Sequence, residues 1–299
     1  MKIVELVVSD HEDGERLDRL IVRRVPGMGR KLASELFACG AVRVGRRLAK
    51  KGERARSGDR ITVELPAPDG AEPEPALPLE LRLERADLVV VNKPAGQPTA
   101  AIRGSTRGTL AGALLARYPE MAQIGSAREP GLVHRLDTQT SGLVIAARTA
   151  GAFDSLRRQL AAGGIDKRYL AVVESAGLPG EGVVDLPIAP HARDARRVVA
   201  REGVRGGRPA ITEWRTLRRR EPWALIEARA SPARRHQVRA HLAAIEHPIA
   251  NDVLYGGRAV QELGARHALH ASYVACAGDA TLRGFAIEEP LPADLADLF

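Results

Sequence analysis

The chain has 299 residues, with 45 lysines and arginines against 37 aspartates and glutamates, so its net charge at neutral pH is +8. This length suits one to three domains with a buried core, and the positive surplus favours a polyanionic partner such as nucleic acid. The 2 cysteines exclude a disulfide framework and a four-cysteine zinc site. No apolar run reaches the roughly 18 residues of a membrane span, and the N-terminus has no signal-peptide core, so we expect a cytoplasmic protein that does not bind membranes.

The first 65 residues predict a small unit of helices and strands. Apolar side chains at helical spacing predict one helix over residues 15–25 and a second over 29–39. Alternating apolar side chains predict strands over residues 2–8 and 59–65. This unit holds 15 basic and 10 acidic residues, so it carries +5 of the total charge of +8.

Two groups of cations flank the second helix of this unit. Arg30 and Lys31 lie in its first turn, where cations oppose the helix dipole, so local stability does not account for them. A helix N-terminus with added cations suits a phosphate group, although a solvated charged face is the common alternative. The expected RNA-binding residues are Arg30, Lys31, Arg43, Arg46, Arg47, Lys50 and Lys51.

Residues 14–65 resemble the S4 RNA-binding domain. The matching residues are Arg16-Leu17-Asp18, Arg30, Cys39-Gly40-Ala41-Val42-Arg43-Val44-Gly45 and Gly58-Asp59. Where that family usually has a serine before the arginine, this chain has Gly29. The resemblance implies an S4-like RNA-binding domain over residues 1–65.

Residues 66–78 separate this unit from the rest of the chain. The stretch contains five prolines and three acidic residues and no aromatic residue. Such a composition predicts an extended linker rather than part of a core. We therefore expect a second domain over residues 79–299.

The second domain alternates predicted strands and helices. Short apolar runs predict strands over 88–92, 142–147, 169–174 and 224–230. Helical spacing predicts helices over 109–118 and 152–160, and Ser231-Pro232 reads as the N-cap and first residue of a helix that runs to Ile245. Arg235 and Arg239 are four residues apart on this helix, so one of them can reach a cleft that the helix borders.

The strongest candidate for chemistry is Asp137, in the polar loop of GLVHRLDTQTSGLVIAART (131–149). An aspartate between two apolar strands is partly desolvated and needs a cationic partner to stay ionised. A loop-capping role for Asp137, paired with Arg135, is the alternative. His134, His236, His241 and His270 are each expected to form structural hydrogen bonds rather than to act as catalytic bases, and we expect no metal site.

Residues 85–290 resemble the pseudouridine synthases of the RluA type. The resemblance begins with the signature His134-Arg135-Leu136-Asp137 and Thr140-Ser141-Gly142-Leu143. Further matches follow in the same order along the chain. They are Asn92-Lys93-Pro94-Ala95-Gly96, Lys167-Arg168-Tyr169-Leu170-Ala171, Arg234, His236-Gln237-Val238-Arg239, His241-Leu242, His247-Pro248-Ile249, Asp252, Tyr255-Gly256 and Leu269-His270-Ala271.

The resemblance implies an α+β fold, with a mixed, mainly antiparallel sheet and helices behind the small N-terminal domain. It implies isomerisation of uridine to pseudouridine in structured RNA by base flipping, without cofactor or metal, in a chain that we expect to be a monomer. Asp137 would attack or stabilise an intermediate, Arg239 would pair with it, and Tyr169 would stack on the uracil and assist removal of the C5 proton. Arg135, His134, Val238 and Leu269 would bind substrate or shape the pocket.

Several points stay open on sequence alone. Thr138, Gln139, Pro232-Ala233 and Arg235 depart from the usual family residues, which puts the choice of substrate in doubt. Ribosomal RNA is favoured over transfer RNA, and the alternatives are a non-catalytic RNA-binding protein of the same fold or a nucleoside-directed glycosidase. A glycosidase usually needs a second carboxylate, and none is evident near Asp137 in the sequence.

Overall fold

A computed structural model describes residues 2–26, 28–65, 70–101 and 105–299. The chain divides into two compact units, Met1–Asp69 and Gly70–Phe299. Each unit has its own apolar core. The units are described separately below.

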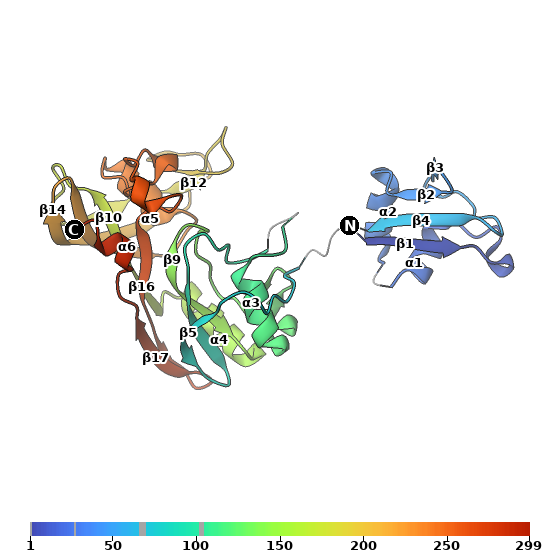
Figure 1. Ribbon diagram of the computed structural model, residues 1–299, viewed down its shortest axis with the longest axis horizontal. Helices are drawn as coiled ribbons and strands as arrows, with labels where there is room; N and C mark the ends of the chain where they lie inside the picture. The colour runs from blue at the N-terminus through green and yellow to red at the C-terminus, as the bar shows by residue number, and fades with distance from the viewer. Residues whose placement is uncertain (1, 27, 66–69, 102–104) are drawn as a thin grey trace. The chain divides into compact units, whose positions relative to one another are not determined.

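The first unit packs two helices against a small antiparallel sheet (Figure 1). Its helices are α1 (Leu17–Arg24) and α2 (Arg30–Ala38). The strands, in the spatial order β1-β4-β2-β3, are β1 (Lys2–Val7), β4 (Arg60–Leu65), β2 (Val42–Val44) and β3 (Arg47–Leu48). A 3₁₀ turn, η1 (Asp10–Glu12), precedes α1. Buried Leu17, Leu20 and Ile21 form the inner face of α1, as their spacing predicts.

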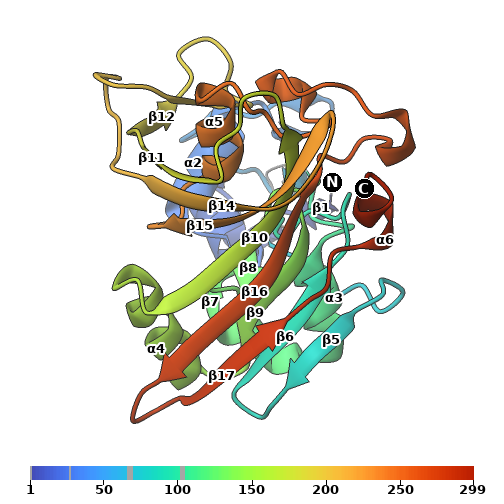
Figure 2. The same cartoon turned by 90° about the vertical axis from the view of Figure 1, so that its left-hand side faces the viewer.

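The second unit is built on one nine-stranded sheet, whose main path runs β11-β14-β15-β10-β16-β9-β6-β5, with β17 pairing β16 (Figure 2). Every pair in this sheet is antiparallel except β16 with β9. The strands are β5 (Glu80–Glu84), β6 (Leu88–Lys93), β9 (Ser141–Ala147), β10 (Ile165–Glu174), β11 (Glu181–Asp185), β14 (Ile211–Arg220), β15 (Trp223–Ser231), β16 (Leu269–Gly278) and β17 (Arg283–Glu288). The expected mixed, mainly antiparallel sheet is confirmed.

Helices and two short hairpins complete this unit. Both views place α3 and α4 on the same face of the sheet. The helices are α3 (Leu110–Arg117), α4 (Ala150–Ala161), α5 (Gln237–Ala244) and α6 (Ala293–Ala296), with 3₁₀ turns η2 (Pro119–Gln123), η3 (Val253–Tyr255) and η4 (Gln261–Leu263). The hairpins pair β7 (Gly125–Ser126) with β8 (Glu129–Pro130) and β12 (Ile188–Pro190) with β13 (Val198–Ala200).

The start of α5 corrects one expectation from the sequence. Ser231 and Pro232 do not begin a helix, because β15 continues to Ser231 and the helix starts only at Gln237. The residue before the helix, His236, has a φ of 54°, which a side chain with a Cβ rarely adopts. A turn in this conformation redirects the chain from the sheet into α5.

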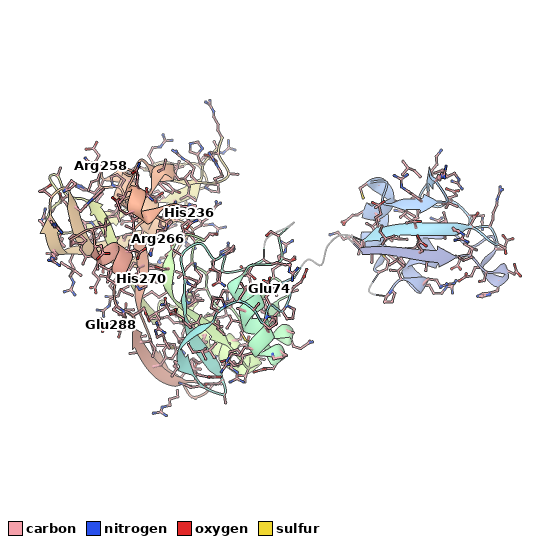
Figure 3. All side chains as sticks on the ribbon, in the orientation of Figure 1. Glu74, His236, Arg258, Arg266, His270 and Glu288 are labelled. Atoms are coloured by element: carbon pink, nitrogen blue, oxygen red, sulfur yellow. The ribbon has the colours of Figure 1, made fainter. Side chains whose placement is uncertain are left out.

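The expectation of an extended linker over residues 66–78 is corrected from Gly70 onward. Residues 66–69 lie outside the described residues. The amide of Ala71 donates to Ala127 O at 2.8 Å, and the amide of Glu74 donates to Gly112 O at 3.0 Å. Figure 3 labels Glu74 where this segment lies along the second unit. Backbone hydrogen bonds at two points hold a segment that has no apolar periodicity, so it belongs to the second unit rather than to a free linker.

The parallel pair of β9 and β16 lies at the middle of the sheet. Its register joins Ser141 to His270 and Gly142 to Ala271. Gly142 has a φ of 114°, and a Cβ there would lie 2.3 Å from Ala271 O, so only glycine allows this close approach. The loop that carries Asp137 leads directly into this point.

Candidate active site

Asp137 lies in the tight loop that precedes β9. Its backbone carbonyl accepts a hydrogen bond from the Thr140 amide at 3.1 Å, which closes a turn over residues 137–140. The side chain of Asp137 is 25% exposed, so the carboxylate is accessible without being fully hydrated. A reactive carboxylate requires this combination of access and partial desolvation.

The first half of this loop is fixed by the segment after β6. The Thr99 hydroxyl donates to Leu136 O at 2.7 Å and accepts from the Leu136 amide at 3.2 Å. The carbonyl of Thr138 accepts from the Gly96 amide at 2.8 Å and from Lys93 Nζ at 3.2 Å. Both neighbours of Asp137 are therefore anchored by their backbone atoms.

Lys93 is a fully buried cation beneath the loop. Its Nζ also donates to the carbonyls of Pro94 at 2.7 Å and Gln97 at 2.8 Å, so all three ammonium hydrogens have an acceptor. Burial lowers its pKa to about 7, against the raising effect of Asp137. The sequence shows Lys93 within the Asn92–Gly96 match, but the pattern alone indicates no role for it.

The second half of the loop is fixed by residues before and within β16. Thr140 Oγ1 lies 2.8 Å from His267 Nε2, and Ser141 Oγ lies 2.8 Å from His270 Nδ1. Arg266 Nη2 donates to Ser141 Oγ at 2.7 Å. Figure 3 shows Arg266 and His270 in the same C-terminal part of the ribbon. Anchors on both sides leave the Asp137 carboxylate in one defined place.

Arg239 holds that carboxylate from α5. Its Nη1 donates to Asp137 Oδ2 at 2.9 Å, while Nε and Nη2 donate to the two oxygens of Asp252 at 2.7 and 2.8 Å. The Arg239 side chain is only 7% exposed. The predicted pair of Asp137 and Arg239 is present, and the guanidinium bonds Oδ2 of Asp137 rather than Oδ1.

The electrostatic balance keeps Asp137 ionised. Burial alone would raise its pKa, but the positive charge that His236 gains in acid, the charge of Arg239 and the Arg239 hydrogen bond lower it below the ordinary value. Burial lowers the pKa of His236 to about 4, so at pH 7 the permanent positive charge beside Asp137 is that of Arg239. Burial opposes the charge of Arg239 as well, yet Asp252 and Asp137 together raise its pKa.

Asp252 is the second carboxylate that the sequence did not reveal near Asp137. It is buried, and both of its oxygens accept from Arg239. A carboxylate committed in this way orients the arginine and is not free to act as the general acid of a glycosidase. The match at Asp252 was the signal in the sequence, but local patterns do not show a contact with Arg239 13 residues away or a site that includes Asp137.

Tyr169 lies on β10, at the register shift between Arg168 and Tyr169 where β10 pairs with β16. Its side chain is buried, and burial together with the Asp137 charge raises its pKa to about 12. The phenol is therefore neutral at pH 7. The charge of Asp137 acts on this phenol, and the catalytic role expected for Tyr169 stays a prediction.

The four expected substrate-binding residues have different surroundings. Arg135, two residues before Asp137 in the chain, is exposed and makes a long contact to Glu129 at 3.4 Å. Val238 and Leu269 are buried core residues on α5 and β16. His134 Nε2 accepts the Ile145 amide at 3.0 Å, so this nitrogen of the ring supports β9. The structural hydrogen bond expected for this histidine is present, and its expected substrate contact stays a prediction.

The side chains of Arg235 and Arg239 contact different parts of the second unit, although the two residues are four apart in the chain. Arg235 lies in the turn before α5, and its guanidinium donates to Ala195 O at 3.1 Å and Arg196 O at 2.7 Å. Both carbonyls lie in the loop between β12 and β13. Arg239 is thus the one of the pair that reaches the site.

The expected RNA-binding residues of the first unit lie on its α2 corner and the hairpin beyond it. Lys51 Nζ donates to Ser34 Oγ on α2 at 2.8 Å, which joins the two groups of cations on one surface. The charge of Arg47 is partly balanced by Glu53. Gly29 caps α2 without a side-chain hydrogen bond, because it replaces the usual serine. Within the described ranges no ion pair is seen for Arg30, Lys31, Arg46 or Lys50, all of which are exposed.

Across the described residues, no group of three or more histidine, cysteine or acidic side chains could hold a metal ion. No helix in that part of the chain has both the length and the apolar character to cross a membrane.

Comparison with known proteins places this site in context. Residues 87–244 match the family described as RNA pseudouridylate synthase. An uncharacterized RNA pseudouridine synthase of Chloroflexus aurantiacus is 38% identical over 300 residues, covering 97% of this chain and 90% of the relative. The ribosomal large subunit pseudouridine synthase D of Xanthomonas campestris is 33% identical over 307 residues, covering 98% and 91%. The human RNA pseudouridylate synthase domain containing 1 has a similar fold, with a TM-score of 0.58 at 24% identity over 75% of this chain and 89% of that one.

Proposed function

This chain belongs to the RNA pseudouridylate synthase family, and we propose that it converts specific uridines of structured ribosomal RNA to pseudouridine, with Asp137 as the attacking carboxylate. The reaction class and the family expected from the motifs are confirmed. The choice of ribosomal RNA is supported by relatives that carry large-subunit activity in their names and cover nearly the whole chain.

The observation that carries the proposal is the environment of the Asp137 carboxylate. The reaction breaks the bond from C1′ to N1, turns the base and joins C1′ to C5, with no change in redox state. A carboxylate held ionised by Arg239 can attack through its other oxygen, Oδ1, because only Oδ2 accepts from the guanidinium. Attack at C1′ of the ribose and attack on the uracil ring both fit this arrangement.

Substrate access requires the nucleotide to leave its helix. A paired and stacked uridine hides the reacting atoms, so the enzyme has to flip it out. Arg135 is exposed two residues from Asp137 and can fill the space left in the stack. Tyr169 then offers a ring face to the uracil and a neutral hydroxyl near C5.

The first unit supplies RNA capture in this proposal. The S4-like resemblance and the joined cations of α2 and the following hairpin support phosphate binding by the first unit. Transfer RNA is the alternative substrate, and a non-catalytic RNA-binding role is the alternative function.

The test uses RNA labelled with tritium at uracil C5, because formation of pseudouridine releases that tritium. Transcripts of large-subunit ribosomal RNA, small-subunit ribosomal RNA and transfer RNA are compared with the wild-type chain. We expect release from large-subunit RNA, and Asp137→Asn should abolish it while RNA binding persists.

Asp166→Asn is the matched control, since Asp166 is an aspartate on β10 that pairs with Arg168 and Arg229 instead of Arg239. Release by Asp137→Asn within tenfold of wild type would contradict the role of this carboxylate. Release from transfer RNA alone would move the proposal to that substrate.

A further inference from the structure

His236 has two polar neighbours that the proposed chemistry leaves unexplained. Its Nδ1 lies 3.0 Å from the hydroxyl of Tyr255, and its Nε2 lies 3.6 Å from Asp137 Oδ1. The imidazole side chain is only 11% exposed. The ring therefore lies between the tyrosine and the carboxylate oxygen that Arg239 does not occupy.

The backbone of His236 is held in an unfavourable conformation to bring the ring there. Its φ of 54° lies in the left-handed region, which glycine adopts freely and a residue with a Cβ adopts uncommonly. Such a conformation costs free energy and persists only where the surroundings enforce it, most often at functional sites. A residue chosen only to begin α5 would more readily be asparagine or glycine.

Tyr255 determines which ring nitrogen of His236 carries the proton. The tyrosine oxygen accepts the Val198 amide at 2.9 Å, and burial raises the pKa of the phenol, so it keeps its own hydrogen at pH 7. The partner that the described residues offer to this hydrogen is Nδ1 of His236. With Nδ1 as acceptor, the proton of the neutral ring is on Nε2.

The other tautomer is disfavoured at both ends. If Nδ1 carried the proton, the phenol hydrogen would lose its acceptor within the described part of the chain. The Nε2 lone pair would then face the negative oxygen of Asp137. Both contacts select the form in which an N–H points at the carboxylate.

We propose that His236 is a positioning residue whose Nε2–H, fixed by the Tyr255 hydroxyl, orients Oδ1 of Asp137 for attack. The atoms lie slightly beyond hydrogen-bond distance without substrate, and catalytic contacts commonly shorten when substrate binds. This inference rests on the proposed role of Asp137. It changes the sequence expectation that His236 forms a structural hydrogen bond only.

The first test reads the tautomer directly and needs no substrate. Nitrogen NMR of the ¹⁵N-histidine-labelled full chain at pH 7 distinguishes the two tautomers among the 8 histidines, and loss of one signal set in His236→Asn assigns His236. We expect the Nε2–H form in the wild type and a shift toward Nδ1–H in Tyr255→Phe. An Nδ1–H form in the wild type would overturn the proposal, whatever the activity of Asp137→Asn.

The second test separates positioning from a structural role. Asparagine suits the left-handed backbone and keeps a polar atom near Tyr255, but its amide is too short to reach Asp137. Glutamine suits that backbone less well, but its amide nitrogen can occupy the position of the His236 Nε2. We expect His236→Gln to keep the single-turnover rate within about threefold and His236→Asn to lose at least tenfold, although His236→Asn should be the more thermally stable variant. Equal rates for the two variants, fast or slow, would overturn the proposal.

A double-variant comparison isolates the effect of the Tyr255 hydroxyl on the tautomer of His236. In the wild type, Tyr255→Phe should slow the reaction at least fivefold, because the ring of His236 can then adopt the wrong tautomer. In the His236→Gln background the same change should cost less than twofold, because an amide has no tautomers. Tyr273→Phe, which contacts Arg168 through its ring, is the control for loss of a tyrosine hydroxyl. The same loss in both backgrounds would contradict the tautomer argument.

Discussion

Arg239 and Asp137 are joined by a hydrogen bond of 2.9 Å although they lie 102 residues apart in the chain. The arginine comes from α5 and the aspartate from the loop before β9. The contact therefore exists only once the sheet is assembled. It couples the correct folding of the second unit to the charge of the reactive carboxylate.

Replacing Arg239 by leucine should nearly abolish activity. The substitution leaves the Asp137 and Asp252 carboxylates without their common cation, and breaking a buried ion pair typically costs about 3–5 kcal/mol. Single-turnover tritium release should fall at least a hundredfold. The folded state should also lose stability in urea unfolding, since Asp252 is buried.

Arg235→Leu is the control for this change, because Arg235 is exposed and donates to two backbone carbonyls of the β12–β13 loop. We expect its rate to stay within about fivefold of the wild type. Equal losses in the two variants would show that the ion pair with Asp137 is not what the reaction needs.

Tyr169→Phe should slow product formation without weakening RNA binding. The ring remains to stack on the uracil, while the hydroxyl near C5 is lost. We expect a reduction of at least tenfold in the final step under single-turnover conditions, with the affinity for RNA unchanged. An unchanged rate would restrict Tyr169 to stacking.

The sequence predicted the parts of this site that depend on local patterns. The apolar runs located β6, β9 and β10, and the signature around Asp137 identified the loop between buried strands. Both inferences concern neighbours within one strand or loop. The helix expected to carry both Arg235 and Arg239 starts only at Gln237, so their spacing alone did not determine that Arg239 reaches Asp137.

The parts that the sequence could not predict depend on contacts between distant segments. Asp252 joins the site through Arg239, and the loop anchors His267 and Thr99 come from opposite sides of Asp137 in the chain. The docking of Glu74 depends on a carbonyl in α3 rather than on its own composition. Local periodicity carries no information about such pairings.

Acid should unfold the second unit before it protonates Asp137. His267 and His270 are buried, and burial lowers the pKa of each to about 4 from an ordinary 6.5. Between these values the unfolded chain binds more protons than the folded one, so the free energy of unfolding falls as the pH falls. The loss is about 1.4 kcal/mol per pH unit for each histidine.

Urea unfolding at pH 7.5, 6.5, 5.5 and 4.5 measures this loss, with the exposed His11→Gln as the control. Because the pKa of Asp137 is lowered, the acid limb of the reaction rate should coincide with loss of near-ultraviolet circular dichroism. If the rate falls at a pH where the fold persists, the acid limb of the rate would instead reflect protonation of a group in the site.

The last prediction separates RNA capture from chemistry. A chain of residues 70–299 should still isomerise uridine in a short stem-loop, because Asp137, Tyr169 and Arg239 all belong to the second unit. The cut is placed at Gly70 because Ala71 and Glu74 are hydrogen-bonded to that unit, so a later cut would damage it.

If the cations of the first unit contact phosphates, removing them should weaken binding to large ribosomal RNA. The slope of log affinity against log salt should then flatten by about 0.7–0.9 for each lost contact. Affinities across a salt series for both chains measure this, with Arg46→Ala/Lys50→Ala in the full chain as a milder change. Identical slopes would exclude the first unit from RNA capture, and a folded but inactive 70–299 chain would show that this unit contributes to the reaction itself.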